Sequence, residues 1–165
     1  MDEIPLLGLA PGALWCASFT DVGPDPDRAL ADAHADLLVS LVQVSEMHMR
    51  YPDFEGWLDA HPDRSRRHPI PDWGVVDDDE MLDTVDQLTG LVMTGHRLVL
   101  HCGAGMGRTG ILSILVLVTL GMPYAHARVH VRTHRGGAGP DSAHQEEQLD
   151  RLAARIEHHR LAAGG

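Results

Sequence analysis

The sequence predicts an α/β fold in which a central, mostly parallel sheet is flanked by helices. Short apolar runs of strand length alternate along the chain with segments whose apolar residues recur at helical spacing. The runs are almost continuously apolar, which is typical of strands that are covered on both faces by helices. The chain has 165 residues, of which 44% are hydrophobic, and we expect one domain over residues 1–165.

Three apolar runs are predicted to form strands of this sheet. The first covers residues 14–19 and lies between two turn-forming Pro-Gly and Gly-Pro pairs. The second covers residues 37–42, where Ser40 is the only polar side chain. The third covers residues 98–101 and leads directly into a glycine-rich segment.

Helices are predicted between and after these strands. Asp25 and Pro26 have the chemistry of an N-cap and a first helical turn. Residues 81–92 place apolar side chains at intervals of four, three and four. The segment before them carries Pro69 and Pro71, so it is predicted to be extended and loop-like. The predicted helices cover residues 25–35, a short stretch after Asp53, and residues 77–95, 109–120, 124–134 and 142–161.

The charge of the chain argues against two classes of partner. The formal net charge is −11, and all 13 basic residues are arginine. An acidic surface repels phosphodiester backbones and anionic lipids, so we expect neither nucleic acid nor a membrane as a partner. The acidic start lacks the basic region of a signal peptide, and the longest apolar run, residues 111–120, is about half of a membrane span. With only two cysteines, we expect a reduced, cytoplasmic protein.

The sequence HCGAGMGRTG, residues 101–110, stands between a predicted strand and a predicted helix. Backbone N–H groups at a helix start have no partners within the helix and carry the positive end of its dipole. A glycine-rich loop over that end forms a cradle for an anion, and the same field stabilises a thiolate at Cys102. Arg108 can bind two anion oxygens in a fork. The alternative is a buried, inert cysteine at the end of a strand.

His101-Cys102, then five residues, then Arg108-Thr109-Gly110 resembles the active-site motif of the cysteine-dependent protein tyrosine phosphatases. The small size resembles the dual-specificity branch of that superfamily. The resemblance implies that Cys102 is the nucleophile, that a cysteinyl-phosphate forms, and that His101 and Thr109 support the loop. It implies no metal and no other cofactor, because Arg108 and the helix dipole supply positive charge. The residues expected to bind the substrate phosphate are Gly103, Ala104, Gly105, Met106, Gly107 and Arg108.

A general acid must protonate the leaving oxygen of a phosphate ester, and it is expected on another loop. Asp72 lies in the segment HPIPDWG, 30 residues upstream of Cys102. This segment resembles the general-acid loop of small dual-specificity phosphatases, which makes Asp72 the predicted acid. The resemblance also implies that Asp72 then acts as the base that activates water to release phosphate. The alternative is that Asp72 only ends a turn. Asp77, Asp78 and Asp79 follow Asp72 and are alternative candidates for the acid, but their position at the start of a predicted helix is more typical of a helix cap.

The segment SAHQEEQL before the last predicted helix resembles the place where this family carries a water-positioning glutamine. Gln145 is the better match and Gln148 is the alternative, while both could be exposed helix residues. Arg132 and Arg135 resemble basic residues that support the phosphate loop from the preceding helix.

The loop interior has no basic residue. In the family that this motif resembles, loops that select multiply phosphorylated inositides often carry lysine there, so the resemblance implies a phosphorylated protein or peptide as substrate. We therefore expect phosphotyrosine, and also phosphoserine or phosphothreonine, to be hydrolysed. Three alternatives stay open: a phosphatase of phosphoinositides or other small molecules, a phosphate-binding module without turnover, and another thiol enzyme such as an arsenate reductase.

Two further features of the sequence concern a disulfide and a metal site. Cys16 could form a disulfide with Cys102, but the simpler interpretation is that Cys16 is a buried cysteine of a strand. His126 and His130 lie one helical turn apart, but no Cys or carboxylate completes a metal site.

Overall fold

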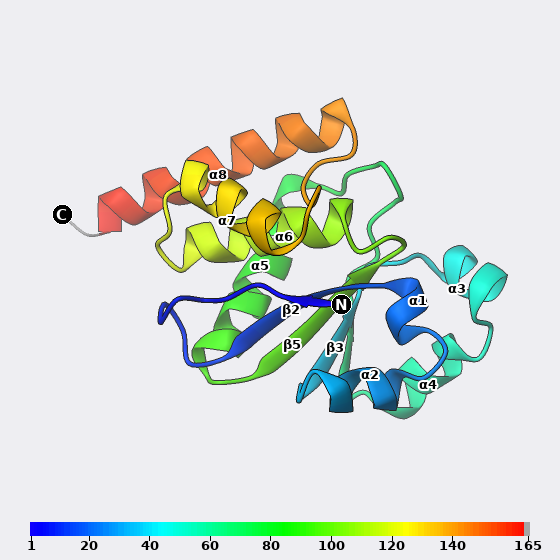
Figure 1. Ribbon diagram of the computed structural model, residues 1–165. Helices are drawn as coiled ribbons and strands as arrows, with labels where there is room; N and C mark the ends of the chain where they lie inside the picture. Colours follow the sequence, from blue (N-terminus) through cyan, green and yellow to red (C-terminus); the bar gives the residue numbers. More distant parts are fainter. Residues whose placement is uncertain (164–165) are drawn as a thin grey trace.

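The computed structural model describes residues 1–163 and has a five-stranded sheet at its centre (Figure 1). The strands are β1 (Asp2–Glu3), β2 (Ala13–Ser18), β3 (Leu37–Ser40), β4 (Ser65–Arg67) and β5 (Arg97–Cys102). Their order across the sheet is β1-β2-β5-β3-β4. Only β1 runs antiparallel to its neighbour, and the other pairs are parallel. The predicted α/β class and the mostly parallel sheet are therefore confirmed.

The register of the central strands brings their carboxyl ends to one edge of the sheet. β5 lies between β2 and β3, with Ser18 opposite Cys102 and Ser40 opposite His101. In a parallel sheet, the loops that leave this edge line the crevice in which ligands bind. The segments that follow β2, β3 and β5 therefore converge around the end of β5.

Eight helices surround the sheet in the described part of the chain. They are α1 (Phe19–Val22), α2 (Pro26–Asp32), α3 (Val44–Arg50), α4 (Phe54–Ala60), α5 (Asp78–Met93), α6 (Gly107–Thr119), α7 (Tyr124–His134) and α8 (Ala143–Ala163). All six predicted helices are present, and most of their ends agree with the prediction to within three residues.

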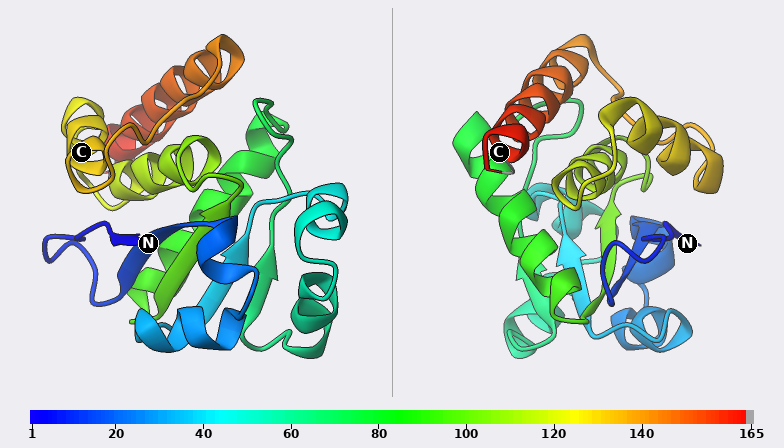
Figure 2. Two further views of the ribbon diagram at one scale, coloured as in Figure 1. Left: turned by 45° about the vertical axis from the view of Figure 1, so that its right-hand side comes forward. Right: turned by 90° about the vertical axis from the view of Figure 1, so that its left-hand side faces the viewer.

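Two apolar cores, one on each face of the sheet, hold these helices in place. Along β5, the side chains of Leu98 and Leu100 join the core of α5, α6, α7 and α8, whereas Val99 joins the core of α1 to α4. This alternation is the period of two that a strand imposes. Figure 2 shows the result, with α6, α7 and α8 gathered on one side of the sheet and α2 and α4 on the other.

The helix that follows β5 is buried on all sides. α6 packs against β2, β5, α5, α7 and α8, and every residue from Gly107 to Val118 is buried. A helix that is apolar around its whole circumference is stable only in such a surrounding. The central position of α6 fixes its N-terminus firmly at the end of β5.

Four elements were missed by the prediction, and each is short. β1 has two residues, and β4 is a polar edge strand of sequence SRR within the segment predicted to be loop-like. Residue 19 was predicted to end a strand but begins α1, because Ser18 and Asp21 form a capping box there. α3 has seven residues and only Met47 is buried, so it shows no apolar period. In residues 1–163, none of the helices combines the length and the apolarity needed to cross a bilayer.

Candidate active site

Cys102 is the last residue of β5, and the loop that follows it leads into the N-terminus of α6. Its side chain is buried, and its Sγ lies 3.8 Å from Oγ1 of Thr109 in the first turn of α6. Met106 occupies the N-cap of α6 and makes no side-chain hydrogen bond to the helix. The first N–H groups of α6 therefore lack a side-chain cap from this position, which leaves them suited to bind an anion beside the thiol.

The backbone carbonyls of residues 103–106 accept hydrogen bonds from three other segments of the chain. The N–H of Phe19 donates to the carbonyl of Gly103 (3.0 Å), and the N–H of Gly139 donates to the carbonyl of Met106 (3.2 Å). Arg135 donates from Nε to the carbonyl of Gly105 (2.6 Å) and from Nη2 to the carbonyl of Ala104 (3.1 Å). Its guanidinium supports the loop directly, whereas Arg132 bonds only to the carbonyl of Ala138 (3.4 Å).

Glycine is required at one turn of this loop. Gly105 has a φ of +69°, and a Cβ at this position would collide with the carbonyl of Ala17 in β2. Both the left-handed backbone and the close approach exclude a side chain. The loop therefore packs closely against the neighbouring strand, and this contact restricts its shape.

Arg108 lies in the first turn of α6, and only 2% of its side chain is exposed. Its Nη1 and Nη2 donate to the two carboxylate oxygens of Glu46 at 2.8 and 2.9 Å, which is a bidentate pair. Nη1 also donates to the carbonyl of Ile70 (2.9 Å). Burial alone would lower the pKa of Arg108, but its bonds to Glu46 raise it above the ordinary value. The guanidinium is therefore a fixed, permanent positive charge at the loop.

Glu46 is a site residue that the sequence analysis missed. Burial acts to raise its pKa, but the hydrogen bonds from Arg108 and from the backbone of Gln43, together with the charge of Arg108, lower the pKa below the ordinary value. Glu46 also accepts a hydrogen bond from the backbone N–H of Gln43 (2.8 Å), so it caps α3 and orients Arg108 at once. The only available signal was the position of Glu three residues after Gln43, which is a capping pattern.

Asp72 comes from the segment between β4 and α5, and it reaches the same site. Its Oδ1 lies 3.0 Å from Nη2 of Arg108, and 57% of its side chain is exposed. The N–H of Gly74 closes a turn onto the carbonyl of Pro71 (3.0 Å), with Trp73 at a φ of +59° inside this turn. The structure thus brings Asp72 to Arg108, at a cleft bordered by the loop after Cys102.

This cleft has a volume of about 600 Å³. Its lining comes from the loop, from Asp72, and from the segments after β2 and β3. The lining residues are Ser18, Thr20, Glu46, Met49, Arg50, Asp72, Gly103 and Ala104. The Asp72 carboxylate lines this cleft, while the Arg108 guanidinium and the Cys102 thiol are buried directly behind its lining. A thiol at a helix N-terminus, a fixed guanidinium and a carboxylate are the groups that transfer a phosphoryl group through sulfur.

A comparison with models of protein families identifies the family of this chain. A model described as "Swiss Army Knife protein, DSP-PTPase phosphatase domain" matches residues 7–159. The chain belongs to this phosphatase family. The resemblance to small dual-specificity phosphatases of the cysteine-dependent superfamily is thereby confirmed.

Solved structures show the same fold for this phosphatase domain. The active form of Tk-PTP has a TM-score of 0.71 at 23% identity, and the match covers 93% of this chain and 97% of that one. Kinase associated phosphatase, with its catalytic-site cysteine replaced by serine, has a TM-score of 0.74 at 20% identity, over 93% and 95% of the two chains. PTPMT1 in complex with PI(5)P has a TM-score of 0.62 at 14% identity, over 81% and 85%. A search of curated proteins finds no match.

The two candidate glutamines of the phosphatase domain are both buried and engaged elsewhere. Gln145 donates from Nε2 to the carbonyl of Gly74 (2.9 Å), and its Oε1 accepts from the backbone N–H of Asp141 (2.9 Å). Gln148 donates from Nε2 to the carbonyl of Val76 (2.7 Å) and to Asp78 (2.9 Å). Both side chains therefore tie α8 to the segment that follows Asp72. Neither makes a hydrogen bond to the loop of residues 103–106 among the bonds of residues 1–163.

His101 packs as an aromatic ring within the core of α1 to α4. Its ring lies 5.1 Å from that of Phe19 and 5.2 Å from that of Phe54. Burial lowers the pKa of His101 to about 3, although the adjacent Cys102 backbone acts in the opposite direction, so the ring is neutral near pH 7. Neither ring nitrogen makes a hydrogen bond of good geometry within residues 1–163. His101 therefore supports the end of β5 through the packing of its ring against Phe19 and Phe54.

The second cysteine is a separate, buried thiol. Cys16 and Cys102 are both free, and the Sγ of Cys16 lies 3.2 Å from Oγ of Ser113 in α6. Burial raises the pKa of Cys16 to about 11, so its thiol stays protonated and weakly nucleophilic near neutral pH. The disulfide considered from the sequence is not formed.

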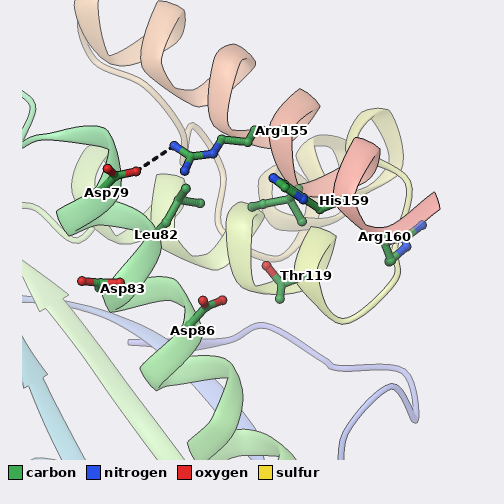
Figure 3. A pocket seen from close by; sticks show the side chains of 9 residues that line it. Asp79, Leu82, Asp83, Asp86, Thr119, Arg155, His159 and Arg160 are labelled. Carbon is green, nitrogen blue, oxygen red and sulfur yellow. Dashed lines mark hydrogen bonds and ion pairs between the residues drawn. The ribbon is translucent and has the colours of Figure 1, made fainter. Parts of the chain in front are cut away.

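Another cavity lies away from this cleft. Its volume is about 730 Å³, and it opens between α5 and α8, with acidic side chains on α5 and basic side chains on α8 (Figure 3). Thr119, at the C-terminal end of α6, lines this cavity. By the helical rise, Thr119 lies about 18 Å along α6 from Gly107, at the opposite end of the helix. It holds no cysteine. In residues 1–163, no three His, Cys, Asp or Glu side chains gather in a way that could hold a metal ion.

Proposed function

We propose that this phosphatase domain hydrolyses phosphate monoesters on proteins or peptides through a covalent intermediate on Cys102. The observation that carries the proposal is the meeting of three chain segments at this cleft or directly behind it. Asp72 from the segment before α5 lines the cleft, the buried Arg108 of the first turn of α6 lies 3.0 Å from Asp72, and the buried Cys102 at the end of β5 directly precedes Gly103, which lines the cleft. These residues are 30 and 36 positions apart from Asp72 in sequence, yet the Asp72 carboxylate lies 3.0 Å from Arg108.

In the first half of the reaction, the Cys102 thiolate attacks phosphorus from the side opposite to the leaving oxygen. Arg108 and the N–H groups of the loop and of the α6 N-terminus hold the other phosphate oxygens, where charge accumulates. The bond from phosphorus to the leaving oxygen breaks, and Asp72 gives its proton to that oxygen. Thr109, whose Oγ1 lies 3.8 Å from the sulfur, can stabilise the thiolate by donating its hydroxyl hydrogen.

In the second half, water attacks the same phosphorus and the sulfur leaves as thiolate. A carboxylate accepts the proton of this water, and Asp72 is one candidate because the first half leaves it ionised. A thiolate nucleophile needs a reducing compartment, so a cytoplasmic location fits this chemistry.

The cleft supports a protein substrate. Among the residues that line the cleft, Arg50 is the one cation, and Arg108 is buried behind the lining. The neighbouring Met49 side chain is 80% exposed. One exposed cation suits a ligand with a single phosphate better than one with several. The apolar Met49 side chain offers a contact for the ring or the flanking residues of a phosphopeptide. We infer phosphotyrosine as the first substrate, with phosphoserine and phosphothreonine as further ones.

A phosphoinositide is the second candidate substrate. One of the similar structures is PTPMT1 in complex with PI(5)P, at 14% identity. A panel of phosphotyrosine, phosphothreonine and monophosphorylated inositide substrates separates the candidates, and the proposal expects the highest kcat/KM for a phosphotyrosine peptide. A preference for the inositide by tenfold or more would overturn the substrate assignment and leave the chemistry intact.

The chemistry itself is tested with p-nitrophenyl phosphate and a metal chelator. The proposal expects hydrolysis in the chelator, no turnover by Cys102→Ser, and unchanged turnover by Cys16→Ser, which is the matched control for loss of a thiol. Turnover retained by Cys102→Ser would refute the mechanism. Phosphate binding by a wild-type protein that never releases p-nitrophenol would instead identify a phosphate-binding module without catalysis.

A further inference from the structure

A third carboxylate, besides those of Glu46 and Asp72, lies beside the loop of residues 103–106. A Cβ placed on Gly107, the first residue of α6, would collide with Oδ2 of Asp141. The Asp141 carboxylate therefore rests directly against the start of α6, one residue from Arg108. The segment of Asp141 connects α7 to α8 and is distant in sequence from both Cys102 and Asp72.

The position of Asp141 is set by its backbone. The N–H of Asp141 donates to Oε1 of Gln145, and the same amide group donates from Nε2 to the carbonyl of Gly74 in the turn after Asp72. Two residues earlier, the N–H of Gly139 bonds to the carbonyl of Met106 in the loop. Gln145 thus positions Asp141 relative to the Asp72 segment, and Gly139 positions it relative to the phosphate loop.

The side chain of Asp141 is left without a partner by this arrangement. Within residues 1–163, no hydrogen bond or ion pair engages its carboxylate, whereas the Asp72 carboxylate is ion-paired with Arg108. Asp141 is exposed, and partial desolvation together with the charge of Asp72 raises its pKa, although Arg108 acts to lower it. The carboxylate is therefore close enough to Asp72 and Arg108 to interact with their charges, and its raised pKa makes it a better proton acceptor than an ordinary aspartate.

We propose that Asp141 is the general base of the second half of the reaction. It accepts the proton of the water that attacks the cysteinyl-phosphate. The oxygen of that water forms its bond to phosphorus as the phosphorus–sulfur bond breaks, the bonding electron pair returns to Cys102 as thiolate, and the proton passes to the Asp141 carboxylate. Asp72 then keeps one task, the protonation of the leaving oxygen. This inference rests on the proposed function.

The first experiment separates the two halves kinetically with Asp141→Asn. The change keeps the shape of the side chain and removes its basicity. Because kcat/KM reports the steps up to departure of the leaving group, it is expected to stay within about threefold of wild type, whereas kcat falls roughly a hundredfold. A burst of p-nitrophenol, equal in amount to the enzyme, should precede the slow steady state. Glu147→Gln, which removes an exposed carboxylate near the start of α8, is the matched control and should leave both constants unchanged.

The second experiment asks whether Asp72 serves as the base instead. p-Nitrophenoxide leaves without needing a proton, so Asp72→Asn can complete the first half with this substrate. If Asp141 is the base, Asp72→Asn turns over p-nitrophenyl phosphate without a burst. Accumulation of phosphocysteine in Asp72→Asn, together with its absence in Asp141→Asn, would overturn the proposal. An equal fall in kcat and kcat/KM for Asp141→Asn, or a kcat within twofold of wild type, would do the same.

These outcomes are distinct from a failure of the proposed function. That function fails if the wild-type protein does not hydrolyse p-nitrophenyl phosphate, or if Cys102→Ser still does. The Asp141 proposal fails only when the wild-type protein and its cysteine dependence are intact. Trapping of the phosphorylated Cys102 by rapid acid quench and mass measurement gives a readout that a purely structural effect of Asp141→Asn would not produce.

Discussion

Replacing Glu46 with glutamine removes the charge that holds Arg108 in the phosphate site. In the folded protein, Arg108 is 2% exposed and Glu46 is 19% exposed, and two hydrogen bonds of 2.8 and 2.9 Å join them. Glutamine offers one oxygen in place of two and carries no charge. One guanidinium N–H group therefore loses its acceptor, and the buried positive charge loses its main counter-charge.

The expected loss of stability follows from this geometry. Removal of one partner of a fully buried ion pair costs about 3–5 kcal/mol. Arg108 keeps the carbonyl of Ile70 and the carboxylate of Asp72 as partners, and Glu46 is partly exposed, which reduces the cost. A charged hydrogen bond contributes about 1.5–3 kcal/mol, so we expect a loss of about 2 kcal/mol for Glu46→Gln. For a domain of this size, the melting temperature should fall by about 4–8 °C.

Activity should fall along with stability, because the guanidinium is no longer held in one orientation. We expect kcat/KM for p-nitrophenyl phosphate to fall about tenfold or more, since small misplacements of a binding group are costly. Urea unfolding and steady-state kinetics measure the two effects, with Glu147→Gln as the exposed control. A stability loss under about 0.5 kcal/mol together with unchanged kcat/KM would refute the assigned role of Glu46.

Three further predictions concern other parts of the site. Asp72→Asn should lower kcat/KM for a phosphotyrosine peptide by roughly a hundredfold, because the leaving oxygen loses its acid; a rate within threefold of wild type would move the acid elsewhere. Gly105→Ala should lower the melting temperature and abolish activity, because the φ of +69° and the carbonyl of Ala17 leave no room for a Cβ; an active, equally stable variant would show that the loop adapts. The pKa of His101 falls from 6.5 to about 3 on folding, so the unfolded chain binds more protons between these values and the free energy of unfolding should decrease as the pH is lowered from 6.5 towards 3. His101→Phe should flatten that part of the pH profile, and an unchanged slope would contradict the buried, neutral ring.

Much of the fold could be predicted because its signals are local. α5 repeats apolar residues at helical intervals, and α7 was predicted with both ends correct, since Pro123 and the loop after His134 mark them. The strands β2, β3 and β5 are covered by helices on both faces of the sheet, so their sequences are nearly continuous apolar runs. α3 could not be found in this way, because a helix of seven residues with one buried side chain has no apolar period.

The chain by itself determined the loop after Cys102, since the order of strand, glycines, arginine and apolar helix is contained in residues 97–119. Pro69 and Pro71 also predicted the loop that carries Asp72. Only the tertiary structure decided which other groups reach the loop after Cys102. Glu46 and Arg108 are 62 residues apart, and Asp141 reaches Gly107 only because α7 and α8 pack on α6. A carboxylate in a short helix or a connecting loop has no local pattern that distinguishes it from a solvated one. The packing of the helices determines which group such a carboxylate contacts, and the distances involved cannot be read from spacing in the sequence.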